Sequence, residues 1–297
     1  TMAITALFPL SLQLAGSFSY DSTIISLYFL TTAYILYLAY RKEKVTFFDW
    51  LVLGGITVLV APIKNVYVFI SLLCILIPRS KFGKPYFSIL FKMTLIVLNF
   101  CILGNSIFSV ILGKINTYGT LHGTSYGTSG SDNMLTYSIT YLLDNPIESI
   151  RLFGYTFLYK LVTGLPLAIG MMSGVIDIRI SFILILVFIV LLFLSISSRD
   201  IPIPFIKIRI LSMLICFLTI SIIFCVYAVA ETPMHSTIIQ GIQGRYFTPF
   251  IPLIFFILYN KKIPPWHGED FEKRLLYAAI LANIPVIYQI FNTIINR

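Results

Sequence analysis

The segment 243–249, which reads Gln-Gly-Arg-Tyr-Phe-Thr-Pro, places a guanidinium group beside an apolar run, where it could bind an anion. An arginine within a bilayer costs about 2.5–3.5 kcal/mol on insertion scales, so it usually has an anionic partner such as phosphate or carboxylate. Gly244 allows a sharp turn and Pro249 can begin a helix, so the segment predicts a loop-to-helix junction that presents Arg245. The alternative is that Arg245 only anchors the chain at lipid phosphates.

Residues elsewhere in the chain have types suited to the same chemistry. Lys64 follows Pro62 between two short apolar runs, which predicts that it lies at the tip of a hairpin. It would be either an ammonium ligand for an anionic head group or a lysine that extends to water, and Tyr67 could assist either role. Asp21 begins a predicted helix, where a carboxylate is also a good cap. The remaining candidates are Glu231, Gln243 and Tyr246.

The composition indicates a polytopic membrane protein. Of 297 residues, 58% are hydrophobic and 11% are charged, and the mean hydropathy is +0.92. The formal net charge of +9 comes from short basic clusters between apolar runs, so we expect no nucleic-acid partner. The four cysteines lie in apolar stretches without metal-ligand spacing, and no phosphate-binding glycine loop is present. The sequence therefore indicates no cofactor and no metal site, although a divalent metal is compatible with it.

The basic clusters also predict a topology. Those at 41–44, 79–84, 199–209 and 261–274 are expected to be cytoplasmic. We expect a short first helix over 2–13, spans over 22–40, 86–112, 178–196, 210–230 and 275–295, a hairpin over 51–78, a short helix over 249–260, a flexible outer loop over 116–132, and interfacial or re-entrant helices over 147–176. This is an all-α polytopic transmembrane helical bundle of about nine spans, with interfacial helices on the outer face.

On this topology the polar candidates share one side of the membrane. Asp21, Lys64, Glu231, Gln243 and Arg245 are all expected on the outer side, although they are far apart in sequence. One site is the economical interpretation. An arginine that offers a planar fork and a lysine that offers a point charge would suit a phosphate-linked lipid.

Four sequence blocks, in this order, resemble a large family of bacterial polytopic membrane proteins that is grouped with the GT-C glycosyltransferases. The blocks are Phe8-Pro9 with 13–21, then 62–67, then 77–79, and finally 242–249, whose Gln-Gly-Arg-Tyr-Phe motif is the most specific. The resemblance implies a GT-C-like bundle in the bacterial plasma membrane with its functional site facing outside. It also implies transfer of a hexosyl or pentosyl group from a polyprenyl-phosphate donor to a glycan acceptor, in cell-envelope polysaccharide assembly or modification.

The resemblance further implies roles for individual residues. Lys64 and Arg245 would bind the carrier phosphate and stabilise the charge of the leaving group, and Gln243 and Tyr246 would orient it. Tyr67 and Glu231 complete the expected substrate-binding set. Family members begin with a further helix and a large acidic outer loop, so we read 1–297 as a single transmembrane domain that lacks them. The catalytic base is expected in that loop, and Asp21 is the weaker candidate for it.

Two other classes of function use similar residues. A non-catalytic component that binds or translocates a lipid-linked glycan would need the cations but no base. A secondary transporter would place its charged residues at mid-membrane depth in broken helices, whereas those of this chain are predicted at the membrane edge. The sequence therefore favours a glycosyltransferase, with the glycan-lipid binder as the alternative.

Overall fold

The computed structural model describes residues 2–17, 19–118, 136–170, 180–195, 205–259 and 270–295, and in these residues the chain is helical without named strands. The α-helices are α1 (Met2–Ala6), α2 (Pro9–Ala15), α3 (Tyr20–Tyr40), α4 (Phe47–Ile63), α5 (Pro85–Tyr118), α6 (Ile139–Asp144), α7 (Pro146–Ile169), α8 (Phe182–Leu194), α9 (Phe205–Ala230), α10 (Ile251–Leu258) and α11 (Phe271–Ile295). The 3-10 helices are η1 (Asn65–Leu76), η2 (Arg79–Lys81), η4 (Gly244–Tyr246) and η5 (Thr248–Phe250).

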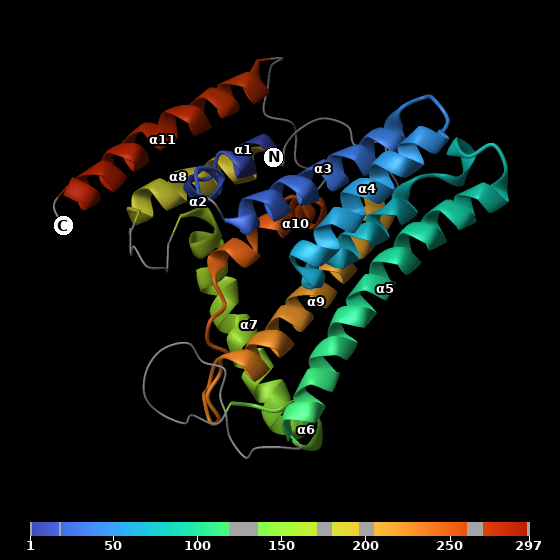
Figure 1. Cartoon of the computed structure of the whole chain (residues 1–297). Helices are drawn as coiled ribbons and strands as arrows, with labels where there is room; N and C mark the ends of the chain where they lie inside the picture. The colour runs from blue at the N-terminus through green and yellow to red at the C-terminus, as the bar shows by residue number, and fades with distance from the viewer. Residues whose placement is uncertain are drawn as a thin grey trace.

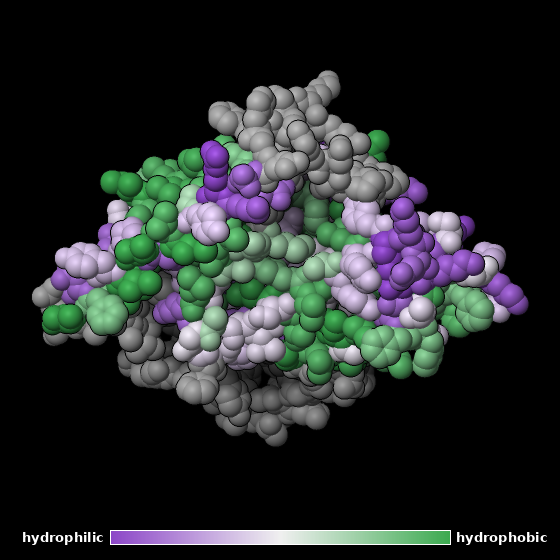
Figure 2. Space-filling model, turned by 90° about the horizontal axis from the view of Figure 1, so that it is seen from above, coloured by the Kyte–Doolittle hydropathy of each residue, from purple (hydrophilic) through white to green (hydrophobic). Residues whose placement is uncertain are grey.

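Five of the described helices are long and apolar enough to cross a membrane. They are α3, α7 and the greater parts of α5, α9 and α11. Hydrophobic side chains cover much of the face seen in Figure 2, as expected for a protein surrounded by lipid. The predicted all-helical class is confirmed, and these helices indicate a bilayer environment.

The region 147–176 differs from its prediction. Interfacial or re-entrant helices were expected there because glycines and Pro166 interrupt the pattern, but 146–169 forms the single helix α7. Pro146 begins this helix, and Pro166 lies in its last turn, where the helix is about to end at Gly170. Residues 119–132 of the expected outer loop, and the basic residues at 199 and 261–262, lie outside the described residues.

The predicted hairpin consists of α4 and η1, and Lys64 joins them. A capping box between Thr46 and Asp49 begins α4. A 3-10 helix repeats every three residues, and in the 12-residue η1 two such rows face neighbouring helices. One buried row is Tyr67, Ile70, Leu73 and Leu76; the other is Val68, Ser71 and Cys74, and it continues to Ile77 just after η1. Burial against α3, α4, α5 and α9 therefore places η1 in the middle of the larger hydrophobic core.

Helices α3 and α4, which lead to the site, lie side by side. In Figure 1, α3 and α4 extend from the 41–46 loop to the centre of the molecule, where α10 lies. With 21 residues, α3 is ~31 Å long, close to the thickness of a bilayer core. Asp21 in its first turn is thus about one bilayer core away from the basic cluster that follows Tyr40. A second core, formed by α1, α8, α10 and α11 with the end of α7, lies beside this group.

Candidate anion-binding site

Asp21 is the carboxylate at which two cations from distant parts of the chain meet. Ser19 caps α3 and accepts a hydrogen bond from Asp21 N at 3.2 Å, which fixes the first turn. Lys64 Nζ lies 3.5 Å from Asp21 Oδ1, and Arg245 Nε lies 3.1 Å from Asp21 Oδ2. The Asp21 side chain is buried, with 5% of its surface exposed, so its charge needs these partners.

The cluster keeps an excess of positive charge. Two cations face one carboxylate, and the Nε–H of Arg245 makes no hydrogen bond, so its contact with Asp21 is an ion pair only. The Arg245 side chain is 32% exposed and that of Lys64 is 17% exposed. The site can therefore accept an anion that approaches from the surface at Arg245.

Three tyrosine rings surround the ammonium of Lys64. Its Nζ lies 3.6 Å from the ring centroid of Tyr246, 5.7 Å from that of Tyr20 and 5.8 Å from that of Tyr67. The faces of these rings attract a cation. Burial nevertheless lowers the pKa of Lys64 to about 8, because lost hydration disfavours the charged form more than Asp21 favours it.

Tyr246 is itself held from two sides. Its carbonyl accepts a hydrogen bond from Tyr67 Oη at 3.1 Å, which connects it to η1. Its hydroxyl lies 2.5 Å from the hydroxyl of Tyr227 on α9, and the two rings pack at 5.3 Å. The ring beneath Lys64 is thus fixed by elements that are distant in sequence.

Helix α7 positions the backbone before and after Arg245. A Cβ atom on Gly244 would lie 2.2 Å from backbone atoms of Leu167, so only glycine fits there. Lys160 Nζ donates a hydrogen bond to Ile242 O at 2.8 Å. The loop-to-helix junction that the sequence predicts is present as η4, η5 and α10, with Pro249 in the first turn of η5.

The structure brings together five of the seven residues singled out by sequence, namely Asp21, Lys64, Tyr67, Arg245 and Tyr246. Glu231 is exposed at the end of α9, and its Oε2 occupies the place where a Cβ atom on Gly241 would lie. Gln243 precedes η4, and its carbonyl accepts a hydrogen bond from Tyr246 N at 3.2 Å. Among the described contacts, neither Glu231 nor the Gln243 side chain pairs with the two cations.

Sequence reasoning missed three residues that shape the site. Tyr20, which is 55% exposed, and Tyr227 carry no charge, so they did not stand out among the 18 tyrosines. Lys160 interrupts an apolar run, and that interruption was a usable signal, since an ionisable residue in a span needs a partner. Within the described residues, no group of three His, Cys, Asp or Glu side chains could hold a metal ion.

A comparison with known protein families identifies the family of the chain. The family model described as predicted membrane protein (DUF2142) matches residues 1–254. The chain belongs to this family. The DUF2142 match contains Asp21, Lys64 and Arg245, so the whole charged cluster lies in the part that the family model describes. A search of curated proteins and a search of solved structures gave no match. DUF2142 membership agrees with the polytopic membrane protein that the sequence predicts.

Proposed function

We propose that this DUF2142 protein binds a polyprenyl-phosphate-linked sugar at the Asp21, Lys64 and Arg245 cluster and transfers the sugar to a glycan acceptor. It would act as a GT-C-like glycosyltransferase of about nine spans, with its site on the outer face of the bacterial plasma membrane, in cell-envelope polysaccharide assembly or modification. The observation that carries the proposal is the convergence of two cations on one buried carboxylate, with a net positive charge that reaches the surface.

The depth of the cluster suits a lipid phosphate. Asp21 lies about one bilayer core from the basic cluster after α3, so the site is at the level of the opposite head groups when α3 spans the membrane. A carrier phosphate would be held there while its prenyl chain remains in the bilayer. Arg245 offers two N–H groups in one plane and Lys64 a point charge, a pair of donors suited to a phosphate.

The same cations suit the chemistry of transfer. The acceptor hydroxyl attacks the anomeric carbon, the bond from that carbon to the phosphate oxygen breaks, and the lipid phosphate leaves with the electron pair. Lys64 and Arg245 would stabilise the negative charge that the phosphate gains. The exposed ring of Tyr20 beside Lys64 offers an apolar surface for the sugar. By the resemblance, the acceptor's proton would go to a carboxylate of a preceding outer loop. The contacts of Asp21 with Lys64 and Arg245 would hold the two cations in place until the phosphate binds.

A non-catalytic component that binds or translocates a lipid-linked glycan is the second candidate. One observation favours it: Asp21, the described carboxylate in contact with the cations, is engaged by both of them. A binder needs no base, so this arrangement would be sufficient for it.

Binding and turnover of a polyprenyl-phosphate sugar by the purified full-length protein in nanodiscs would test the proposal. Arg245→Ala should weaken binding about 10- to 100-fold, since hydrogen bonds to charged groups contribute about 1.5–3 kcal/mol. Arg245→Lys should also weaken it, because a point charge cannot bind in a bidentate manner. The matched control is Arg274→Ala, at an exposed arginine near the start of α11.

The outcomes separate the candidates. Binding that depends on Arg245, with release of lipid phosphate when acceptor is added, supports the transferase. Binding without turnover under any acceptor supports the glycan-lipid binder. Unchanged binding in Arg245→Ala would mean that Arg245 is a membrane anchor and would refute the site.

A further inference from the structure

A second group of cations lies at the other end of α3, about one bilayer core from Asp21. The exposed members are Lys42, Lys44, Arg79, Lys84 and Lys207, which come from three separate segments. The exposed acid among these segments is Glu43. The strongly hydrophilic patch at the right of Figure 2 lies at this end of the molecule. Within the described residues, none of the five cations forms an ion pair with an acidic residue.

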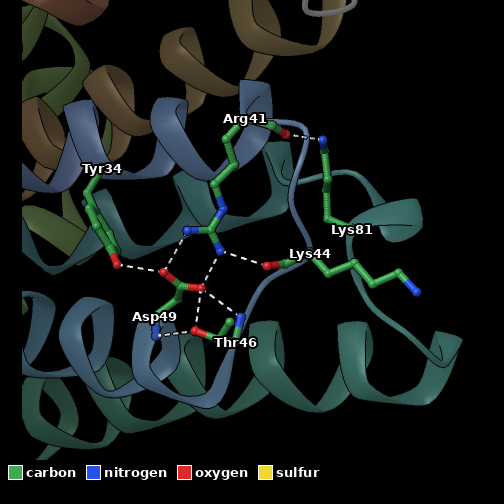
Figure 3. A network of polar contacts seen from close by, with 6 residues as sticks. All are labelled: Tyr34, Arg41, Lys44, Thr46, Asp49 and Lys81. Carbon is green, nitrogen blue, oxygen red and sulfur yellow. Dashed lines mark hydrogen bonds and ion pairs between the residues drawn. The ribbon is translucent and has the colours of Figure 1, made fainter.

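The loop that carries Lys42 and Lys44 is held rigidly (Figure 3). Arg41 donates hydrogen bonds to both carboxylate oxygens of Asp49, with Nη1 at 3.0 Å from Oδ1, and its Nη2 also donates to Lys44 O at 2.8 Å. Tyr34 Oη donates to Asp49 Oδ1 at 2.8 Å, and Thr46 N donates to Oδ2 at 2.6 Å. These bonds fix the backbone from the end of α3 to the start of α4.

The two basic loops are also joined to each other. Val45 N donates to Lys81 O at 2.9 Å, and Lys81 Nζ donates to Arg41 O. Lys92 Nζ on α5 donates to Ile77 O at 2.6 Å, where η1 ends. Arg41, Lys81 and Lys92 therefore make hydrogen bonds within the protein, and these bonds hold the loops that carry Lys42, Lys44, Arg79 and Lys84 together.

Aromatic side chains surround this basic face. Phe47, Phe48, Tyr86 and Phe87 are 69%, 70%, 53% and 46% exposed. Lys84 Nζ lies 5.9 Å from the ring centroid of Tyr86. Exposed rings beside lysines are typical of side chains at the level of lipid head groups, because the rings enter the interface while the charges stay in water.

We propose that this basic face, defined by Lys42, Lys44, Arg79, Lys84 and Lys207, binds anionic phospholipid head groups of the adjacent leaflet. It is a site separate from the cluster at Asp21 and does not depend on the function proposed for that cluster. Clusters of four to eight cations beside a membrane helix attract acidic lipids. Here the hydrogen-bonded loops present the charges from a fixed backbone, so less conformational freedom is lost when a head group binds.

Binding of phosphatidylglycerol to the purified full chain, compared with phosphatidylcholine, tests this proposal. Native mass spectrometry or thermal-shift titration in detergent gives the affinities. Wild type should prefer phosphatidylglycerol, and each cation removed should weaken its binding about fivefold. Lys42→Gln with Lys44→Gln, and Arg79→Gln with Lys84→Gln, should each cost up to about 25-fold.

A control variant on α11 changes the net charge by the same amount as each of these double variants. Lys273 pairs with Asp270 at 3.2 Å, so Lys273→Gln with Arg274→Gln removes two cations from a neighbourhood that already contains acids. Its effect should stay below about twofold if the basic face is a specific site. Equal losses in all three double variants, or no preference of wild type for phosphatidylglycerol at physiological salt, would overturn the proposal.

Discussion

Replacing Asp21 with asparagine should raise the affinity for an anion. It should also lower the stability of the ligand-free protein. Asp21 is the negative charge that the two cations now share, so Asp21→Asn leaves Lys64 and Arg245 without a counter-ion. Removing one partner of a buried ion pair costs about 3–5 kcal/mol, and the exposure of Arg245 reduces this to roughly 2–4 kcal/mol. An anion that takes the place of the carboxylate recovers part of that cost, and recovery of about 1.4 kcal/mol raises its affinity tenfold.

The assay is calorimetric or thermal-shift titration of wild type and variant with inorganic phosphate and with a polyprenyl phosphate. The expected signature is a lower melting temperature without ligand and a larger rise with ligand in Asp21→Asn. Asp270→Asn is the control, because it removes an exposed carboxylate that also pairs with a lysine. The anion affinity of this variant should equal that of wild type. Weaker anion binding in Asp21→Asn would refute the reasoning, since it would mean that Asp21 and the anion do not compete for the same cations.

Three further predictions concern the parts around Asp21. Because the pKa of Lys64 is about 8, anion affinity should fall as the pH rises through 8 and the ammonium loses its charge. Lys64→Arg should remove this fall in the same titration. Lys160→Met should weaken anion binding several-fold with little effect on thermal stability, because the bond to Ile242 O positions the segment before Arg245; a loss of stability alone would contradict this. Gly244→Ala should destabilise the fold by about 1–3 kcal/mol or more in denaturation, because its Cβ would overlap the backbone of α7, whereas Gly154→Ala, with nothing within 4 Å, should be neutral or stabilising.

The charged residues, together with proline and glycine as helix-breaking residues, were enough to predict part of the site. Pro62 and the basic residues on both sides of 51–78 predicted a hairpin with Lys64 at its tip, and the structure has this hairpin. Pro249 and Gly244 predicted the junction that presents Arg245. These predictions were correct because they depend on local rules: proline begins helices, glycine permits close approach, and lysine and arginine avoid the apolar core.

Other features depend on contacts that no local pattern records. The Tyr67 hydroxyl reaches the Tyr246 carbonyl across 179 positions of sequence. Helix α7 continues through Gly154 and Gly164 although glycine weakens helices, and its side facing 239–248 is held by Thr156, Lys160 and Ala168. The burial of η1 likewise depends on its contacts with α3, α4, α5 and α9. Tertiary packing, which overrides local propensity, decided each of these.

A comparison of the two buried carboxylates in the first turns of α3 and α4 explains why we place the proposed anion at Asp21 rather than at Asp49. Asp49 accepts five hydrogen bonds from Tyr34, Arg41 and Thr46, which leaves its charge fully compensated. Asp21 accepts two long ones, from Ser19 at 3.4 Å and Lys64 at 3.5 Å, beside an ion pair with Arg245. A carboxylate bound as tightly as Asp49 fixes the fold. In the proposed site, the looser contacts of Asp21 would let both cations exchange it for an incoming phosphate, because replacing weak contacts costs less than breaking strong ones.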